Sequence, residues 1–429
     1  MKTLIKNATI ISMDSSRNQI EKNMDILIEN DKITQISSNI NIQEDEIKII
    51  DATNKVVLPG LINTHSHIPM SIFRETIGNC DLQEWLTQKI WPMEDKLTEE
   101  DIYYSTLLSS IEMIETGCTT INDMYFVTDA IIKAAKETGI RLQTTRTLMD
   151  MVSEEEGESR FKELLRLMNE YKDEPNITFN AGLHSLYTTN EPYVKKSIKF
   201  AQDNNLLVHM HFCENSKEVE DVRKMYNSEP IEVLKRNFQN VPTLLAHVVK
   251  VNDEDLKCLK EMNMSVAHCP ISNLKLGCGI ANITEMLKLG INVSLGTDGQ
   301  GSASNLNLFE TMRAAALLQK GIHENPTVIP SYEVLKMATI NGAKALGLED
   351  KIGSITEGKQ ADIIILDLEK SMLKPENDLI SQIVYNADGR DVETTIIAGK
   401  VLMENGKLCN NIDKSQLYKK CDEIINRIK

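Results

Sequence analysis

The sequence predicts an α/β protein in which a (β/α)8 barrel of the TIM type carries a small β-sandwich built from both chain ends. Through the middle of the chain, short apolar runs alternate with helical segments, which is typical of parallel strands joined by helices. At both ends, strand-like segments alternate apolar and polar residues and are separated by turns. The 429 residues are too many for one small domain and suit a large barrel with an accessory unit.

The two chain ends share the pattern of a small sheet. DILIEN and KITQIS, near the N-terminus, alternate apolar with polar residues. ADIIILDL and TTIIAGKVLMENGKL, near the C-terminus, are also strand-like, with turns at Ala398-Gly399 and Asn405-Gly406. We therefore expect residues 1–55 and 350–410 to fold together as the sandwich, 56–349 to form the barrel, and 411–429 to form a C-terminal helix.

The middle of the chain contains eight segments that read as buried strands. Helical segments lie between them; in one of these, Thr98 and Asp101 predict a capped start and Gly117 predicts the end. The eight strand segments span 55–67, 118–124, 141–148, 176–184, 206–214, 243–248, 264–270 and 292–298. Eight strands that alternate with helices describe a (β/α)8 barrel.

The charge balance narrows the classes of partner. The formal net charge is −16, from 47 basic and 63 acidic side chains. An acidic surface repels phosphate backbones and anionic membranes, so we expect neither nucleic acid nor a membrane as partner. No local basic cradle for a nucleotide with several phosphates is evident. We therefore expect a small-molecule substrate, and whether the chain forms a homo-oligomer stays open.

The cysteines and the N-terminal segment indicate a cytoplasmic protein. None of the eight cysteines forms a CxxC pair, which argues against a zinc ribbon or a thioredoxin-like site and favours free thiols in a reducing compartment. The N-terminal segment MKTLIKNATIISMDSS lacks the apolar core of a signal peptide. No stretch approaches the roughly 20 apolar residues that span a bilayer.

Histidines and one aspartate gather at the predicted carboxyl ends of the strands. In barrels of this kind that rim carries the active site. Of the eight histidines, only His209 and His323 lie elsewhere, and His209 is two residues before His211 on the same strand face. The residues at the rim are His65, His67, His184, His211, His247, His268 and Asp298. This placement is the strongest functional signal in the sequence.

Four of these side chains predict a metal site. His65 and His67 are two residues apart, so on a strand both imidazoles point to the same face. His211 and Asp298 end the fifth and eighth strands, and in a closed barrel the eighth strand lies beside the first. Three histidines and a carboxylate are typical ligands of Zn²⁺, and Fe²⁺ also accepts them. We expect one ion per subunit.

Two further groups near this site suit hydrolysis. Such an ion lowers the pKa of a bound water to about 7. Asp298 could ligate through one oxygen and accept the proton of the water with the other. Glu214, three residues after His211, can shuttle a proton, and His247 can orient the water. For His268 a hydrogen-bonding role without chemistry is favoured.

Longer motifs resemble a known family. PGLINTHSH, HMHFCE, LLAHVV, HCPISNLKLGCGI and LGTDGQGSASNLNLFETMR look like the amidohydrolase superfamily. More narrowly they resemble its branch of 5-methylthioadenosine/S-adenosylhomocysteine deaminases and relatives such as chlorohydrolases. The resemblance covers nearly the whole chain. It implies one zinc ion, attack of hydroxide on C6 of adenine and release of ammonia, with Glu214 protonating the purine at N1.

The resemblance also suggests substrate contacts. DLQEWLTQKIWPMEDKL is similar to the substrate loop of the family, in which Trp85 matches the residue that packs on the nucleoside and Glu94 matches the one that binds ribose hydroxyls. Arg146 and His184 match further contact positions. Arg160, in the segment EEEGESR that we expect to be a loop, matches a second arginine that would help to hold a homocysteine carboxylate.

Departures from the family pattern leave the substrate open. Leu183 and Leu186 replace the usual prolines around His184, HCP replaces HNP, Ala281 replaces a common proline, and Cys80 stands where an acid is frequent.

The alternative within enzymes is a deaminase or chlorohydrolase of guanine, cytosine or a triazine. A cytidine-deaminase site is excluded because no PCxxC occurs, and a carboxylated-lysine centre is disfavoured because strand four ends in a histidine. The alternative outside enzymes is a nucleoside-binding or structural-zinc protein, which Glu214 and His247 argue against.

Overall fold

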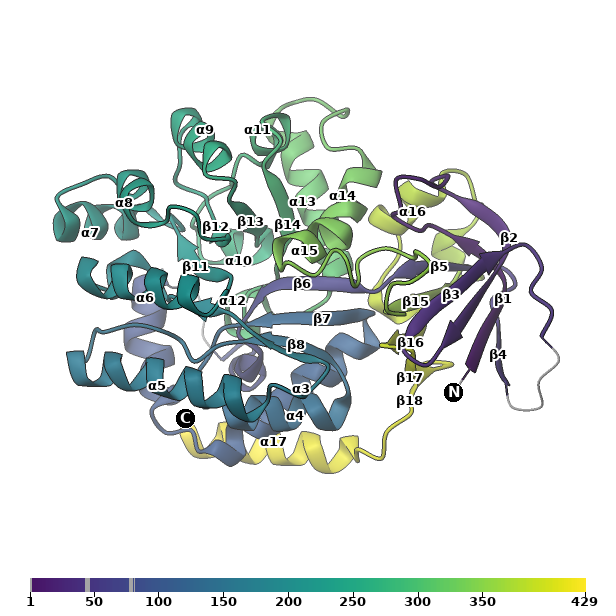
Figure 1. Ribbon diagram of the computed structural model, residues 1–429, viewed down its shortest axis with the longest axis horizontal. Coiled ribbons are helices and arrows are strands. Elements are labelled where there is room, and N and C mark those ends of the chain that lie inside the picture. The colour runs from purple at the N-terminus through teal and green to yellow at the C-terminus, as the bar shows by residue number, and fades with distance from the viewer. Residues whose placement is uncertain (1, 43–46, 77–79, 81) are drawn as a thin grey trace.

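The computed structural model describes residues 2–42, 47–76, 80 and 82–429, and it shows a barrel packed beside a β-rich unit (Figure 1). Helices surround the barrel strands, and the β-rich unit combines the purple N-terminal and yellow-green C-terminal parts of the chain. Asp81, the first residue of the segment similar to the family's substrate loop, lies outside the described residues. Within those residues no helix is both long and apolar enough to cross a bilayer.

The β-rich unit is one nine-stranded sheet to which both chain ends contribute. Its order is β18-β17-β16-β15-β5-β1-β2-β3, and β4 pairs with β1. The central strand β5 joins the two ends, since it runs parallel to β1 and antiparallel to β15. Buried isoleucines fill the core against it. The strands are β1 (Lys2–Ile10), β2 (Glu21–Glu29), β3 (Lys32–Ser37), β4 (Ile47–Asp51), β5 (Lys55–Pro59), β15 (Ile363–Asp367), β16 (Val392–Ile397), β17 (Lys400–Glu404) and β18 (Lys407–Leu408).

The chain passes from this sheet into the barrel at Gly60. The sequence pattern suggested one strand over 55–67, but the structure divides it into β5 and β6 (Leu61–Ser66). A Cβ atom on Gly60 would lie 2.1 Å from the hydroxyl oxygen of Thr119, so only glycine lets the backbone approach so closely. An apolar run on its own does not show where a strand changes sheets.

The barrel strands follow in chain order and run parallel. They form two hydrogen-bonded groups, β6 to β9 and β10 to β14. The expected strand over 176–184 is split at Asn180, whose N–H donates to Thr144, so β9 pairs with β8 and β10 pairs with β11. The other strands are β7 (Cys118–Asp123), β8 (Arg141–Thr144), β9 (Ile177–Phe179), β10 (Ala181–Gly182), β11 (Val208–Phe212), β12 (Thr243–His247), β13 (Ser265–His268) and β14 (Asn292–Leu295).

Side-chain and backbone hydrogen bonds close the barrel between its first and last strands. The hydroxyl of Thr64 on β6 donates to the carbonyl of Leu295 on β14 at 2.9 Å. The N–H of Asp298 donates to the carbonyl of His65 at 2.9 Å. These contacts place the loop after β14 directly beside β6. The expected neighbourhood of the first and eighth strands is therefore present, and it brings Asp298 to the two histidines of β6.

Helices cover the outside of the barrel. Thr98 and Asp101 form the capping box of α3, and Gly139 ends α4 in a left-handed conformation. The C-terminal helix α17, at the lower edge of Figure 1, packs on α3. The α-helices are α1 (Leu82–Glu84), α2 (Trp91–Glu94), α3 (Glu99–Glu115), α4 (Thr128–Thr138), α5 (Glu154–Glu170), α6 (Glu191–Asp203), α7 (Ser216–Tyr226), α8 (Pro230–Asn237), α9 (Asp253–Glu261), α10 (Pro270–Lys275), α11 (Ile283–Lys288), α12 (Gln300–Ala303), α13 (Leu308–Ile322), α14 (Ser331–Ala338), α15 (Ile340–Ala345), α16 (Leu379–Tyr385) and α17 (Lys414–Ile428). The short 3₁₀ turns are η1 (Ile68–Phe73), η3 (Leu186–Thr188), η4 (Ser371–Leu373) and η5 (Gly389–Asp391), and η2 (Trp85–Ile90) is a π-helical segment.

A buried ion pair joins the barrel to the β-rich unit. Arg141 on β8 donates to both carboxylate oxygens of Asp362, which precedes β15, at 3.0 and 2.9 Å. Arg141→Met should lower the free energy of unfolding by about 3–5 kcal/mol, because it leaves a buried carboxylate without its cation. Urea denaturation measures this change. The double variant Arg141→Met/Asp362→Asn should recover part of the loss; an equal or larger loss in the double variant would show that the charge of Asp362 is not the cause.

Candidate active site

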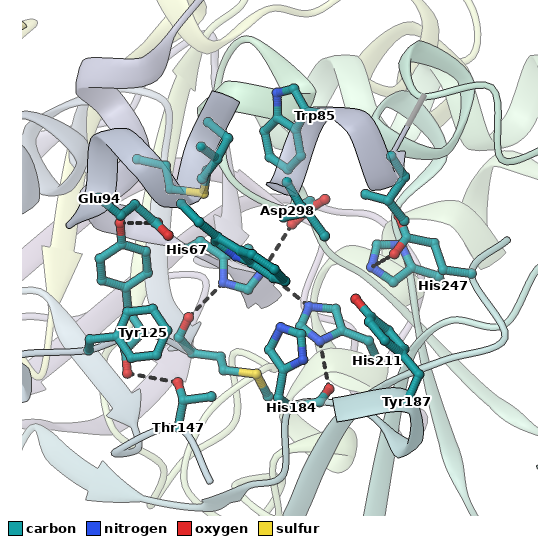
Figure 2. Close-up of a pocket in the computed structure, with 18 residues that line it drawn as sticks. His67, Trp85, Glu94, Tyr125, Thr147, His184, Tyr187, His211, His247 and Asp298 are labelled. Atoms are coloured by element: carbon teal, nitrogen blue, oxygen red, sulfur yellow. Dashed lines mark hydrogen bonds and ion pairs between the residues drawn. The ribbon is translucent and has the colours of Figure 1, made fainter. Parts of the chain in front are cut away.

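The carboxyl ends of strands β6, β11 and β14 bring the sequence-predicted metal ligands together, and β12 places His247 beside them. The ligand atoms of His65, His67 and His211 lie within 4.8 Å of one another, and so do those of His65, His247 and Asp298. His67, His211 and Asp298 point toward one another across the centre of the pocket in Figure 2. Four elements distant in the chain thus supply donors that face one small volume.

The distances between these donors suit a shared cation. The Nε2 atoms of His67 and His211 lie 3.2 Å apart. Oδ1 of Asp298 lies 3.1 Å from Nε2 of His67 and 3.5 Å from Nε2 of His65. An ion that binds imidazole nitrogen and carboxylate oxygen at about 2.0–2.2 Å would sit between donors about 3–3.6 Å apart. The donor set is that of a divalent metal site.

The other ring nitrogens of His67 and His211 set the tautomers of these two histidines. Nδ1 of His67 donates to the carbonyl of Met124 at 2.6 Å, and Nδ1 of His211 donates to the carbonyl of His184 at 2.7 Å. With a proton held on Nδ1, Nε2 is the nitrogen that offers its lone pair to a metal ion, and binding of the ion would displace any proton from it. Nε2 of His65 is buried without a hydrogen-bond partner among the described residues, as expected of an atom whose partner is an ion.

Electrostatics favour a cation at this point. Burial alone would lower the pKa of His67, but its contact with the carboxylate of Asp298 outweighs burial and raises that pKa to about 9. Burial would likewise raise the pKa of Asp298, yet His65 and His67 hold it well below its ordinary value. A carboxylate kept ionised in a buried site attracts positive charge, and a divalent ion satisfies it together with the imidazoles.

Asp298 is oriented by its neighbours. Its Oδ2 accepts hydrogen bonds from the hydroxyls of Ser272 and Ser302, so Oδ1 is the oxygen that faces the histidines. Its φ of +67° lies in the left-handed region, which is uncommon for a residue other than glycine. Such backbone conformations persist where the surrounding structure enforces them, often at functional sites.

Glu214 and His247 lie at the edge of the metal site. Glu214 is buried, with Oε2 at 3.8 Å from Nε2 of His247 and Oε1 at 3.6 Å from the thiol of Cys278. Burial, helped by the nearby charges of Asp298 and Glu218, raises the pKa of Glu214 to about 7. A carboxyl that titrates near neutral pH is suited to take up and release a proton.

His247 presents a free nitrogen to the same space. Its Nδ1 donates to Oδ1 of Asn273 at 2.8 Å, so in the neutral ring Nε2 carries the lone pair. That Nε2 is buried and has no hydrogen-bond partner among the described residues. It can therefore accept a hydrogen bond from a water molecule beside the metal ligands.

A cavity extends from these residues between the segment of Trp85 and Glu94 and the loops after β7 and β10. Trp85 lies in η2 and Glu94 ends α2. Glu94 accepts a hydrogen bond from the hydroxyl of Tyr125, and burial raises the pKa of Glu94 to about 7 (Figure 2). Most of the wall is apolar, with contributions from Met70, Leu82, Leu86, Trp91 and Phe126. The cavity suits a flat, largely apolar ligand with a few hydroxyl groups.

His184, Arg146 and Arg160 take different positions. His184 lines the cavity, and burial lowers its pKa to about 3, so its ring is neutral. Neither Arg146 nor Arg160 is among the described residues that line the cavity. Both guanidinium groups lie over the ring of Phe126, and that ring lines the cavity. Arg146 donates to Glu163 at 2.6 Å.

The expectation that Arg160 lies in a loop is wrong. It lies in α5, where its guanidinium donates to the carbonyl of Thr147 and to Glu156. Ser153 caps the helix by accepting from the N–H of Glu156, and three glutamates follow in the first turn. A serine cap followed by acids favours a helix start, since both satisfy the free N–H groups of the first turn.

Sequence reasoning missed several residues that orient the site. Ser272 and Asn273 belong to the ISNLKL segment and Ser302 to the GSAS segment, but their contacts with Asp298 and His247 could not be read from the sequence. Nε2 of His209 lies 2.9 Å from Nδ1 of His65. Its spacing of two from His211 was the only signal for it, because alternate residues of a strand share a face.

The chain is similar to known proteins over almost its full length. The model of the Amidohydrolase family matches residues 56–402. The 5-methylthioadenosine/S-adenosylhomocysteine deaminase of Thermoanaerobacter pseudethanolicus is 43% identical over 412 residues, 95% of each chain. The 5′-deoxyadenosine deaminase of Methanocaldococcus jannaschii is 41% identical, covering 94% of this chain and 96% of the relative. Among solved structures, a zinc-bound adenosine deaminase from Xanthomonas campestris superposes with a TM-score of 0.94 at 28% identity, over 99% of this chain and 98% of the other.

Proposed function

The chain belongs to the amidohydrolase family, and on that premise we propose that it is a zinc-dependent hydrolytic deaminase of 5′-modified adenosines. The observation that carries the proposal is the convergence of three histidines and Asp298 on one point beside the buried carboxyl of Glu214. The named relatives act on methylthioadenosine, S-adenosylhomocysteine and 5′-deoxyadenosine, which share the adenine and ribose groups and differ at the 5′ position.

His65, His67, His211 and Asp298 would hold the ion. The donor set and the orphaned Nε2 of His65 fit Zn²⁺, and the zinc-bound relative supports this choice over Fe²⁺. When bound, the ion supplies a Lewis acid that makes water nucleophilic at neutral pH. The proposed ligands His67, His211 and Asp298 line the cavity, so water can reach the ion, which distinguishes the site from a closed structural zinc site.

The side chains around the ion account for the proton transfers of deamination. In the net reaction, the oxygen of water bonds to C6 of adenine, the C6–N bond breaks and ammonia leaves. Glu214 is the proposed proton carrier: it protonates the ring at N1 and its raised pKa lets it change state near pH 7. His247 accepts a hydrogen bond from the attacking water through Nε2, and Asp298, which would bind the ion through Oδ1, is the proposed acceptor of the proton that the water loses.

The segment that carries Trp85 and Glu94 is the proposed nucleoside site. Trp85 offers a buried aromatic ring to the purine or ribose, and the carboxyl of Glu94 suits hydrogen bonds from the 2′ and 3′ hydroxyls. His184 lines the same cavity and is proposed as a substrate contact. Arg146 and Arg160 lie behind Phe126 and would reach only a long 5′ substituent.

A substrate panel tests the proposed function. Initial rates of ammonia release should be measured on metal-analysed protein with methylthioadenosine, S-adenosylhomocysteine, 5′-deoxyadenosine, adenosine, guanine, cytosine and a chlorinated triazine. The proposal expects the highest kcat/KM for one of the four adenosine compounds. A clear preference for guanine, cytosine or the triazine would support the alternative heterocycle hydrolase instead. No turnover of any compound by zinc-loaded protein would refute both.

Glu94→Ala should impair ribose recognition rather than chemistry. Because hydrogen bonds to a charged group contribute about 1.5–3 kcal/mol, KM should rise by about 10- to 100-fold with a smaller change in kcat. The measurement is steady-state kinetics with the preferred nucleoside and with its 2′,3′-dideoxy analogue. The analogue lacks the hydroxyls and serves as the control, since Glu94→Ala should hardly alter its KM. An unchanged KM for the ribosyl substrate would remove Glu94 from the proposed site.

A further inference from the structure

The carboxyl of Glu218, a residue without an assigned role in the reaction, is buried next to Glu214. It lies in the first turn of α7 and is 2% exposed. Oε1 accepts hydrogen bonds from the N–H of Cys213 at 2.9 Å and from the hydroxyl of Ser185 at 3.3 Å. Oε2 accepts from the N–H of Glu214 at 2.7 Å. Three hydrogen-bond donors therefore converge on the Glu218 carboxylate, and one of them is the backbone N–H of the proposed proton carrier Glu214.

The backbone held by these contacts is strained. Cys213 has a φ of +50°, in the left-handed region that residues other than glycine rarely adopt. On the opposite side, its carbonyl accepts from the N–H groups of Val249 at 3.0 Å and Lys250 at 2.7 Å. The turn at Cys213 redirects the chain between β11 and α7, so that Glu214 faces the cavity. Glu218 supplies the hydrogen bonds on one side of that turn.

Helix capping does not account for these contacts. The side chain of Asn215 already caps α7 by accepting from the N–H of Glu218 at 2.8 Å. A glutamate in the position of Glu218 ordinarily reaches back to the N–H of the cap residue itself. Here it reaches past the cap to the two preceding residues. Burying a carboxylate is costly, and no lysine or arginine pairs with Glu218 among the described residues.

We propose that Glu218 is the positioning residue for Glu214: its carboxylate holds the turn at Cys213 and thereby aims the carboxyl of Glu214 at the substrate. This inference rests on the proposed function, because it assigns Glu218 an effect through the proton carrier of that reaction. Both carboxylate oxygens are needed. In Glu218→Gln one oxygen becomes an NH2 group that cannot accept the N–H of Cys213 or Glu214.

The expected effect falls on kcat. Since a misplacement of about 1 Å can cost about 10²-fold in rate, Glu218→Gln should lower kcat by about 10- to 100-fold. KM should stay within about 3-fold and zinc content should not change, because the hydrogen bonds that the Glu218 carboxylate accepts from described residues come from Ser185, Cys213 and Glu214, none of which is a proposed metal ligand or part of the nucleoside segment. A kcat within about 2-fold of the parent protein would overturn the inference.

A double-mutant cycle separates positioning from general damage. If Glu218 acts through the carboxyl of Glu214, then Glu218→Gln should change kcat by less than about 2-fold when added to Glu214→Gln. A structural role would instead produce the same fold loss in both backgrounds, and that result would also overturn the inference. Glu218→Asp provides the second variant if the glutamine protein folds poorly; its shorter carboxylate cannot reach all three donors, so the same cycle applies.

Asp255→Asn is the matched control. Asp255 occupies the equivalent helix position in α9, where it completes a capping box with Asn252. Its loss should lower stability without changing kcat. The cycle requires a parent protein that releases ammonia from an adenosine compound. Failure of that parent assay contradicts the proposed function, whereas failure of the cycle in an active parent contradicts only the role of Glu218.

Discussion

Glu214→Gln is expected to lower kcat by about 10²-fold or more while the protein keeps its full complement of zinc. The amide has almost the shape of the carboxyl but cannot carry a proton from water to the purine ring. Glu214 is not among the proposed ligands, and its Oε2 lies 3.8 Å from Nε2 of His247. The ion should therefore remain bound while the proton transfer is lost.

Single-turnover and steady-state rates, measured with metal analysis on the same preparation, test this expectation. Glu254→Gln, at an exposed position on α9, is the control for changing one glutamate to its amide and should leave kcat unaltered. Activity equal to that of the parent protein in Glu214→Gln would remove the proton role. Loss of zinc in that variant would mean instead that Glu214 contributes to metal binding.

His211→Ala is expected to abolish both metal binding and turnover. Even residues that only support a metal ligand change affinity by about 10- to 100-fold when they are replaced, so loss of a ligand should weaken zinc by more than about 10²-fold. Nε2 of His211 lies 3.2 Å from that of His67, and its removal leaves one side of the site without a donor. Turnover should fall by more than about 10³-fold because the metal-activated water is lost.

Competition with a chromophoric chelator measures the affinity directly, independent of activity. His323→Ala is the matched control, since His323 follows α13 and is exposed. It should bind one zinc ion per chain with parent affinity. If His211→Ala retained zinc at parent affinity, the site would lie elsewhere and the proposed hydrolysis would lose its basis.

Much of the site could be anticipated because strand ends and ligand chemistry are visible in a sequence. His65 and His67 share a strand face, and strands of a parallel barrel all end at one rim. A rim crowded with histidines therefore predicts proximity without any coordinates. The alternation of strands and helices likewise predicted the barrel. The strand-like segments at both chain ends predicted a shared β-rich unit.

Other features depend on contacts that no local pattern encodes. The division of 55–67 into two strands follows from the approach of Gly60 to Thr119, and the split at Asn180 follows from its pairing with Thr144. The helix around Arg160 was misjudged because its acidic start resembles a solvated loop. The points at which a strand divides and the segments that become helical depend on which parts of the chain pack against each other.

Residue types and strand periodicity alone determined that three histidines and an aspartate would share a barrel rim and that this rim would suit a metal hydrolase. Only the tertiary structure decided how those groups are aimed: Ser272 and Ser302 turn Asp298, Asn273 sets the tautomer of His247, and Glu218 holds the turn that carries Glu214. The physical reason is that hydrogen bonds act over about 3 Å between residues far apart in the chain, so orientation emerges only once the strands have met.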